Sequence, residues 1–138
     1  MAKILGIDYG TQRVGFALSD DSWKYAFAFE TFDYSNKKNI FNYMQDLCKH
    51  EDVQEIVLGM PLDQHGHQGQ KAKEVLVFAD KVKSELNLPV FFEDERFTSV
   101  MAKKLFHEAD KKHRKNKGMI DQEAAKLILQ VYLDKKNG

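Results

Sequence analysis

The chain has 138 residues, of which 43% are apolar and 30% charged; this is the composition of an ordinary globular protein, and the length fits one domain over residues 1–138. No run is long enough to span a membrane and no secretory signal precedes the first apolar run, so no membrane partner is expected. Cys48 is the only cysteine, which excludes an intrachain disulfide and favours the cytoplasm as the compartment. The formal net charge is zero, which is less basic than is usual for proteins that bind nucleic acid.

The first part of the chain predicts three consecutive strands. Residues 3–9 form an apolar run that ends at Gly10, residues 13–19 form a second run, and residues 25–32 are rich in aromatic side chains. Only a short turn separates the first two runs, so we expect them to pair as an antiparallel hairpin.

Helices and strands alternate in the rest of the chain. The predicted elements are, in order, a helix capped by Ser35 or Asn36, a strand over 53–59, a helix whose apolar residues lie between Ala72 and Leu86, a strand over 88–93, a helix from Thr98 or Ser99 to about Ala109, and a last helix from Ile120 to near Leu133. Consecutive strands favour antiparallel pairing and helix-separated strands favour parallel crossovers. We therefore expect an α/β fold with a mixed five-stranded sheet and helices on both faces.

Asp8 is unusual because it ends an apolar run that should be buried on both faces. A bare carboxylate there would cost several kcal/mol unless a cation, a basic partner or backbone donors offset it. The alternative is that Asp8 caps the turn at Gly10, since Asp is common beside Gly in turns. The sequence gives both interpretations equal weight.

Two further acidic sites follow. Glu93, Asp94 and Glu95 end the fifth strand beside Arg96, either as an ordinary polar strand end or at the sheet edge where open α/β folds place their sites. Asp121 opens the last helix and points toward the edge of its apolar stripe, although the helix dipole alone favours an acid there.

Taken together, these acids predict a metal site. Carboxylates gathered at one sheet edge repel one another unless a cation lies between them, and hard oxygen ligands suit Mg²⁺ or Mn²⁺. Two such ions would activate water for phosphodiester cleavage.

Several segments resemble the YqgF/RuvX family, whose members are described as Holliday junction resolvases and as pre-16S rRNA nucleases. The matching segments, in the family's order, are residues 6–15 (GIDYGTQRVG) with 17–20 (ALSD), 58–62 (LGMPL) with Gly66, 94–98 (DERFT) and 120–125 (IDQEAA). The resemblance implies a ribonuclease H-like fold and metal-dependent nuclease chemistry. It makes Asp8, Glu95 and Asp121 the acidic triad, with Asp94 as the alternative to Glu95.

Basic residues near these acids are candidates for binding nucleic acid. They are Arg13, Arg96, and the segment that contains Lys111, Lys112, Arg114, Lys115 and Lys117. Each has an ordinary alternative: the arginines would pair with neighbouring acids, and the basic segment would be a solvated loop.

The leading hypothesis is therefore an endonuclease that matures 16S rRNA precursor as a monomer or homodimer, with the ribosome as a further candidate partner. Its alternatives are a resolvase of four-way DNA junctions, an ATP-binding domain of the sugar-kinase or actin type, and a non-catalytic nucleic-acid or ribosome-assembly protein.

Overall fold

The computed structural model of the chain describes residues 2–63, 65–95 and 117–138. Its elements are β1 (Lys3–Asp8), β2 (Arg13–Ser19), β3 (Ala26–Asp33), the short 3-10 helix η1 (Tyr34–Asn36), α1 (Ile40–His50), β4 (Val53–Met60), α2 (Gln70–Leu86), β5 (Val90–Asp94) and α4 (Lys117–Asn137). The helix predicted from Thr98 or Ser99 to Ala109 lies outside the described residues. None of the helices in the described ranges is both long and apolar enough to cross a membrane.

The five strands form one sheet in the order β3-β2-β1-β4-β5. β2 pairs antiparallel with both β1 and β3, whereas β1–β4 and β4–β5 are parallel pairs. This is the predicted mixed sheet: the turn after β1 makes a hairpin, and α1 and α2 carry the chain across to the next parallel strands. The sheet therefore confirms the predicted topology.

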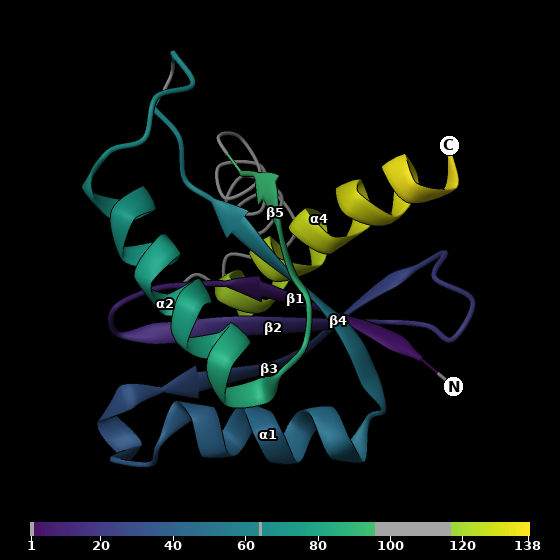
Figure 1. The fold of residues 1–138 in the computed structure, drawn as a ribbon, viewed down its shortest axis with the longest axis horizontal. Helices are drawn as coiled ribbons and strands as arrows, with labels where there is room; N and C mark the ends of the chain where they lie inside the picture. Colours follow the sequence, from purple (N-terminus) through teal and green to yellow (C-terminus); the bar gives the residue numbers. More distant parts are fainter. Residues whose placement is uncertain (1, 64, 96–116) are drawn as a thin grey trace.

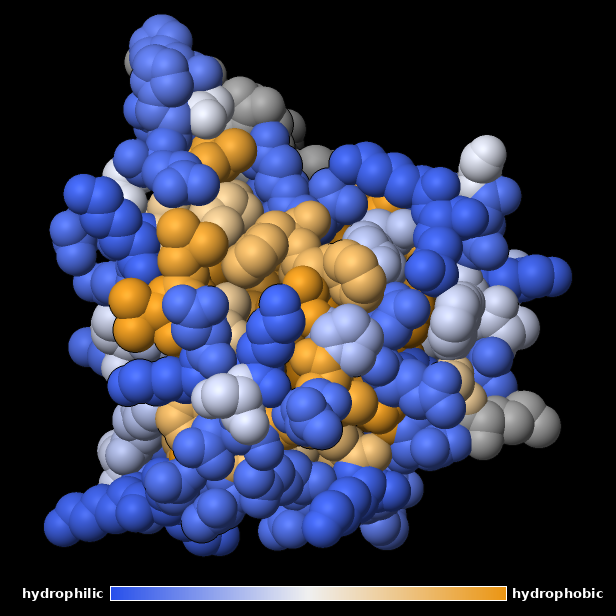
Figure 2. Space-filling view, viewed as in Figure 1, coloured by the Kyte–Doolittle hydropathy of each residue, from blue (hydrophilic) through white to orange (hydrophobic). Residues whose placement is uncertain are grey.

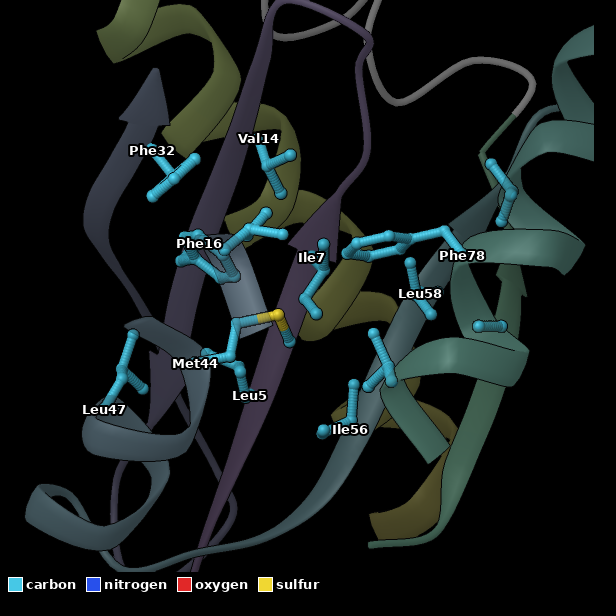
Figure 3. Packing of buried hydrophobic residues seen from close by; sticks show 14 of the residues in the cluster. Leu5, Ile7, Val14, Phe16, Phe32, Met44, Leu47, Ile56, Leu58 and Phe78 are labelled. Carbon is cyan, nitrogen blue, oxygen red and sulfur yellow. The ribbon is translucent and has the colours of Figure 1, made fainter. Parts of the chain in front are cut away.

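Helices cover both faces of the sheet, as predicted. α1 and α2 lie on one face and α4 crosses the other (Figure 1). The larger core lies under α1 and α2, and Figure 3 shows its apolar side chains filling the space between the sheet and these helices. The smaller core, under α4, consists of Ile4, Ala17, Ala26, Val57, Ala125, Ile128, Leu129 and Leu133. The valine, leucine and isoleucine side chains buried in this core stabilise the fold by about 1.5–3 kcal/mol each.

The start of α1 differs from the prediction. The predicted caps, Ser35 and Asn36, lie instead in η1, whose N-cap is Asp33. Asn39 caps α1 by accepting hydrogen bonds from the backbone amides of residues 41 and 42, so the helix begins at Ile40. Lys37 has a φ of 62°, which ends η1 and separates it from α1. The helix prediction was therefore right in kind and wrong in its first residues.

Apolar side chains also reach the surface. Figure 2 shows them gathered in the middle of one face, over β5 and its surroundings, within a rim of hydrophilic residues. On β5, Phe91 is 41% exposed and Phe92 is 42% exposed. β5 lies at the edge of the sheet, so neighbouring elements cover the side chains of Phe91 and Phe92 only in part.

Candidate active site

Asp8 ends β1 on the face of the sheet that α4 covers. Side chains alternate along a strand, and Ile4 on the same strand packs in the core under α4. Gly6 also faces α4, because a Cβ there would lie 2.7 Å from the Cβ of Leu129. Asp8 continues this alternation and extends the α4 face to the strand end, where it lies opposite Gly15 of β2.

Glu95 reaches the same end of the sheet from β5. Its backbone amide donates a hydrogen bond of 3.1 Å to the carbonyl of Met60, which extends the β4–β5 pairing beyond the last residue of β5. The Glu95 side chain lies over Gly59, since a Cβ at that position would come within 2.6 Å of Oε2. Glu95 is only 9% exposed. The missing side chain of Gly59 thus provides the space that buries Glu95.

Glycines on the central strands also bring Asp121 to the site. A Cβ at Gly15 would lie 2.2 Å from the carbonyl oxygen of Asp121, and a Cβ at Gly59 would lie 2.5 Å from a side chain of α4. Contacts this short do not occur between real atoms, so α4 lies against the sheet only because these positions are glycine. The close approach places Asp121 beside the ends of β1 and β2.

A pocket of about 270 Å³ opens where these elements meet. The described residues that line it come from the β1–β2 turn, the start of α2, the end of β5 and α4: Asp8, Tyr9, Gly10, Thr11, Gln12, Arg13, Pro61, Lys71, Glu74, Val75, Glu95, Ile120, Asp121 and Ala124. Asp8, Glu95 and Asp121, which are far apart in the sequence, all face this one cavity. The structure therefore places the three predicted acids along one pocket.

Asp8 and Glu95 are electrostatically coupled. Burial, the charge of Asp8 and a hydrogen bond with Asp8 together raise the pKa of Glu95 to about 9, and burial is the largest of these causes. The Lys71 ammonium acts in the opposite direction and lowers this pKa. In the metal-free protein Glu95 therefore holds a proton at neutral pH. Paired carboxylates of this kind fit a divalent cation, which would take the place of that proton.

Asp121 is held by Arg13. The Arg13 Nε donates a hydrogen bond of 2.8 Å to Asp121 Oδ2, and their side chains are 26% and 19% exposed. Of the two roles considered for Arg13, the structure contains the ion pair with an acid. Within the described ranges, no three His, Cys, Asp or Glu side chains gather closely enough to hold one metal ion. The acid pair of Asp8 and Glu95 is thus the centre of the site, and Asp121 lines the same pocket in an ion pair with Arg13.

The remaining predicted residues are placed as follows. Asp94 is the last residue of β5 and is not among the described pocket-lining residues, so Glu95 is the acid that enters the cavity. Successive strand residues point to opposite faces, which explains this difference. Lys117 is the first residue of α4. The other predicted nucleic-acid contacts lie outside the described residues: Arg96, Lys111, Lys112, Arg114 and Lys115.

Lys71 and Glu74 on α2 are pocket residues that the sequence did not single out. The apolar stripe of α2 predicted a buried face but not which end of the sheet the helix start would approach. The feature of the sequence that could have identified them is their position, because they lie next to the buried residues Ala72 and Val75 at the start of the helix. Side chains beside an apolar stripe lie at the edge of the core, where a pocket can form.

A family model described as "RuvX: Holliday junction resolvase" matches residues 2–135. A protein of Endomicrobium trichonymphae named "Putative pre-16S rRNA nuclease" is 42% identical over 136 residues, which cover 97% of this chain and 96% of the relative. A protein of Dictyoglomus turgidum with the same name is 36% identical over 132 residues, which cover 96% and 94%.

Solved structures with the same architecture come from resolvases. The Fowlpox virus resolvase in complex with Holliday junction DNA has a TM-score of 0.61 at 16% identity, and the match covers 99% of both chains. RuvC of T. thermophilus in complex with a Holliday junction has a TM-score of 0.59 at 13% identity, covering 100% of this chain and 97% of RuvC. The fold is therefore ribonuclease H-like, as the sequence resemblance implied.

Proposed function

Because the chain belongs to the RuvX family, we propose that it is a divalent-metal-dependent endonuclease that hydrolyses phosphodiester bonds in a precursor of 16S rRNA. The observation that carries this proposal is the pocket, in which acids from β1, the end of β5 and α4 meet around the buried contact between Asp8 and Glu95. Without a cation, the burial and mutual repulsion of these acids destabilise the folded protein. A bound divalent cation would offset this cost, which explains why the acids lie together.

Asp8 and Glu95 would hold Mg²⁺ or Mn²⁺, and Asp121 would complete a ligand set for two ions. When bound, the metal lowers the pKa of a water molecule and neutralises charge on the phosphate. Glu95 must give up its proton before it can act as a ligand, since only the carboxylate binds metal. Asp94 is the alternative ligand in this proposal, but its side chain would have to turn toward the pocket to reach the metal, because it does not line the pocket in this structure.

The cationic groups of the pocket would position the substrate. Arg13 holds Asp121 in the free protein and keeps its remaining guanidinium donors for a phosphate oxygen. Lys71 lies on the α2 wall, where its charge favours ionised Glu95 and attracts the phosphate. We extend the proposal to Arg96 and to the basic residues of the segment 111–117, which would bind phosphates of the nucleic-acid backbone.

The second candidate is cleavage of four-way DNA junctions. The description of the matching family and the junction complexes of both structural neighbours favour it. The pocket binds a phosphate in either substrate, because the acids do not contact the sugar; only contacts to the 2′-hydroxyl would separate RNA from DNA. We give preference to the rRNA precursor because the relatives at 36% and 42% identity carry that name. Action on this substrate would place the protein in the cytoplasm beside the assembling ribosome, as a monomer or homodimer.

The test is cleavage of end-labelled 16S rRNA precursor and of a labelled four-way junction, each with Mg²⁺ or Mn²⁺. Asp8→Asn should abolish cleavage, whereas Asp21→Asn, on the exposed turn between β2 and β3, serves as the matched control and should cleave normally. Cleavage of the junction alone would replace the first substrate with the second. No metal-dependent cleavage of either substrate would contradict the enzymatic proposal and leave a binding role.

A further inference from the structure

A second hollow lies beside the candidate active site, between α2 and the segment that leads into α1. Its volume is about 430 Å³. The aromatic and cationic residues that line it are Tyr9, Tyr34, Phe41, Lys73, Phe78 and Lys81. We call it the α1–α2 groove. It meets the catalytic pocket at Tyr9 and Glu74, which line both cavities.

The strand end of β1 connects the two cavities. Tyr9 directly follows Asp8, and successive side chains in extended backbone point to opposite sides. Asp8 faces the catalytic pocket under α4, while Tyr9 packs against the core under α1 and α2. The two cavities therefore adjoin at the end of β1, so a polymer bound at Asp8 has the α1–α2 groove beside it.

The wall of the groove is built from stacked aromatic rings. The centroids of Tyr9 and Phe78 are 4.4 Å apart with an interplanar angle of 30°, and those of Phe41 and Phe78 are 5.8 Å apart at 32°. Phe78 is buried, whereas Tyr9, Tyr34 and Phe41 are half-buried and so present part of their surface to the groove. Aromatic surfaces of this kind stack on nucleobases of any sequence.

Two lysines border these rings. Lys73 and Lys81 are eight positions apart on α2, so they lie on the same side of the helix, with Val77 between them. Both are exposed, and neither has an ion-pair partner among the residues that the structure describes. Among the residues that the structure describes, the groove lining contains these two lysines and one acid, Glu74. The described lining thus carries a net positive charge in a chain whose formal charge is zero.

We propose that the α1–α2 groove binds a single-stranded flank of the substrate, with bases stacked on Tyr34 and Phe41 and phosphates held by Lys73 and Lys81. The inference rests on the proposed function, since the flank belongs to the strand whose phosphodiester lies at Asp8. In a duplex arm the base faces are already covered by neighbouring bases, so only unpaired nucleotides offer the faces that these rings bind. The protein thereby selects substrates in which an unpaired segment adjoins the cleaved bond.

The binding test uses a fluorescein-labelled single-stranded RNA of about ten nucleotides, which suits a site of this kind. Anisotropy is measured with Mg²⁺ in the Asp8→Asn background, so that binding is separated from cleavage. We expect Lys73→Glu with Lys81→Glu to weaken binding at least about tenfold and to reduce its salt dependence. Lys83→Glu is the matched control: Lys83 is exposed on the same helix but does not line the groove, and we expect binding within about twofold of the parent.

Stacking is tested at Tyr34 with an RNA that contains 2-aminopurine, whose fluorescence is quenched when the base stacks. Quenching should persist in Tyr34→Phe and disappear in Tyr34→Ala. The melting temperature of every variant is measured to confirm that it is folded. The lysine variants change only exposed side chains, so they test the groove even if Tyr34→Ala unfolds.

Equal weakening by Lys83→Glu and by the groove lysine variant would overturn the proposal. So would a duplex RNA that binds as tightly as the single strand and depends equally on the groove lysines. Groove-dependent binding without cleavage of any substrate would contradict the proposed enzyme and retain the groove as a single-strand site. Cleavage that is insensitive to the groove lysines on flanked substrates would overturn the groove alone.

Discussion

Glu95→Gln should stabilise the metal-free protein. Burial and the charge of Asp8 raise the pKa of Glu95 to about 9, while an unfolded chain has the ordinary value of 4.5. At pH 7 folding therefore requires Glu95 to take up a proton, which costs up to about 3 kcal/mol. Glutamine has the same shape and is neutral at every pH, so it folds without this cost and still donates a hydrogen bond to Asp8.

The pH dependence has a definite sign. Between pH 4.5 and about 9 the folded state binds the Glu95 proton and the unfolded state does not. The free energy of unfolding of the parent therefore falls as pH rises through this window. In Glu95→Gln this contribution to the slope is absent. The gain from the substitution should vanish below pH 4.5 and grow toward pH 9.

The assay is urea or thermal unfolding in EDTA from pH 5 to pH 8.5. A gain of about 1–3 kcal/mol at pH 7 corresponds to a rise in Tm of roughly 3–10 °C for a chain of this size. Added Mg²⁺ should stabilise the parent more than the variant. Glu93→Gln is the matched control. Glu93 is also buried, but Lys135 Nζ lies 2.6 Å from its Oε2, so removing the Glu93 charge should not raise the free energy of unfolding. A lower Tm for Glu95→Gln in EDTA, or a pH slope equal to that of the parent, would refute the reasoning.

The structure makes three other predictions, on α4 packing, on the pocket and on the buried thiol of α1. Gly15→Ala places a Cβ 2.2 Å from the backbone of α4 and should lower the free energy of unfolding by about 3 kcal/mol in urea titrations, whereas Gly69→Ala, which meets nothing within 4 Å, should change it little. Lys71→Met should lower the cleavage rate about tenfold at unchanged Tm, while Lys83→Met, elsewhere on α2, should leave the rate unaltered. Burial raises the pKa of Cys48 to about 11, so its reaction with a disulfide reagent at pH 8 should be at least about a hundredfold slower in the folded protein than in urea; equal rates would contradict its burial.

The sheet was predictable because each strand is a compact apolar run bounded by turn residues, as in residues 13–19, where prediction and structure coincide. The first residue of α1 could not be predicted, because Asp33 and Asn39 are both residues that cap helices. Only the packed structure decides which turn each of them caps. The acids were predictable for a similar reason: Asp8 is conspicuous in an apolar run. The choice of Glu95 over Asp94 depends on the register of β5 against β4, which residue types alone do not determine.

The contacts across the pocket were also beyond local patterns. Lys71 has only one sequence signal, its position beside the apolar stripe of α2, because its role arises from where α2 docks. The ion pair between Arg13 and Asp121 joins residues 108 positions apart. A sequence pattern identifies which side chains are unusual for their local element, whereas the docking of distant elements decides which of them meet.

The site depends as much on missing side chains as on charged ones. Gly15 allows α4 to bring Asp121 to the strand ends, and Gly59 leaves the space in which Glu95 is buried beside Asp8. The same burial that couples the two acids makes the metal-free fold less stable, so a cation that binds only the folded state adds stability as its concentration rises above its Kd. Filling either glycine position would relieve no charge and would separate the acids. Consequently Gly59→Ala should weaken metal-dependent stabilisation although it removes no ligand atom, because the Glu95 side chain must move to admit the new methyl group.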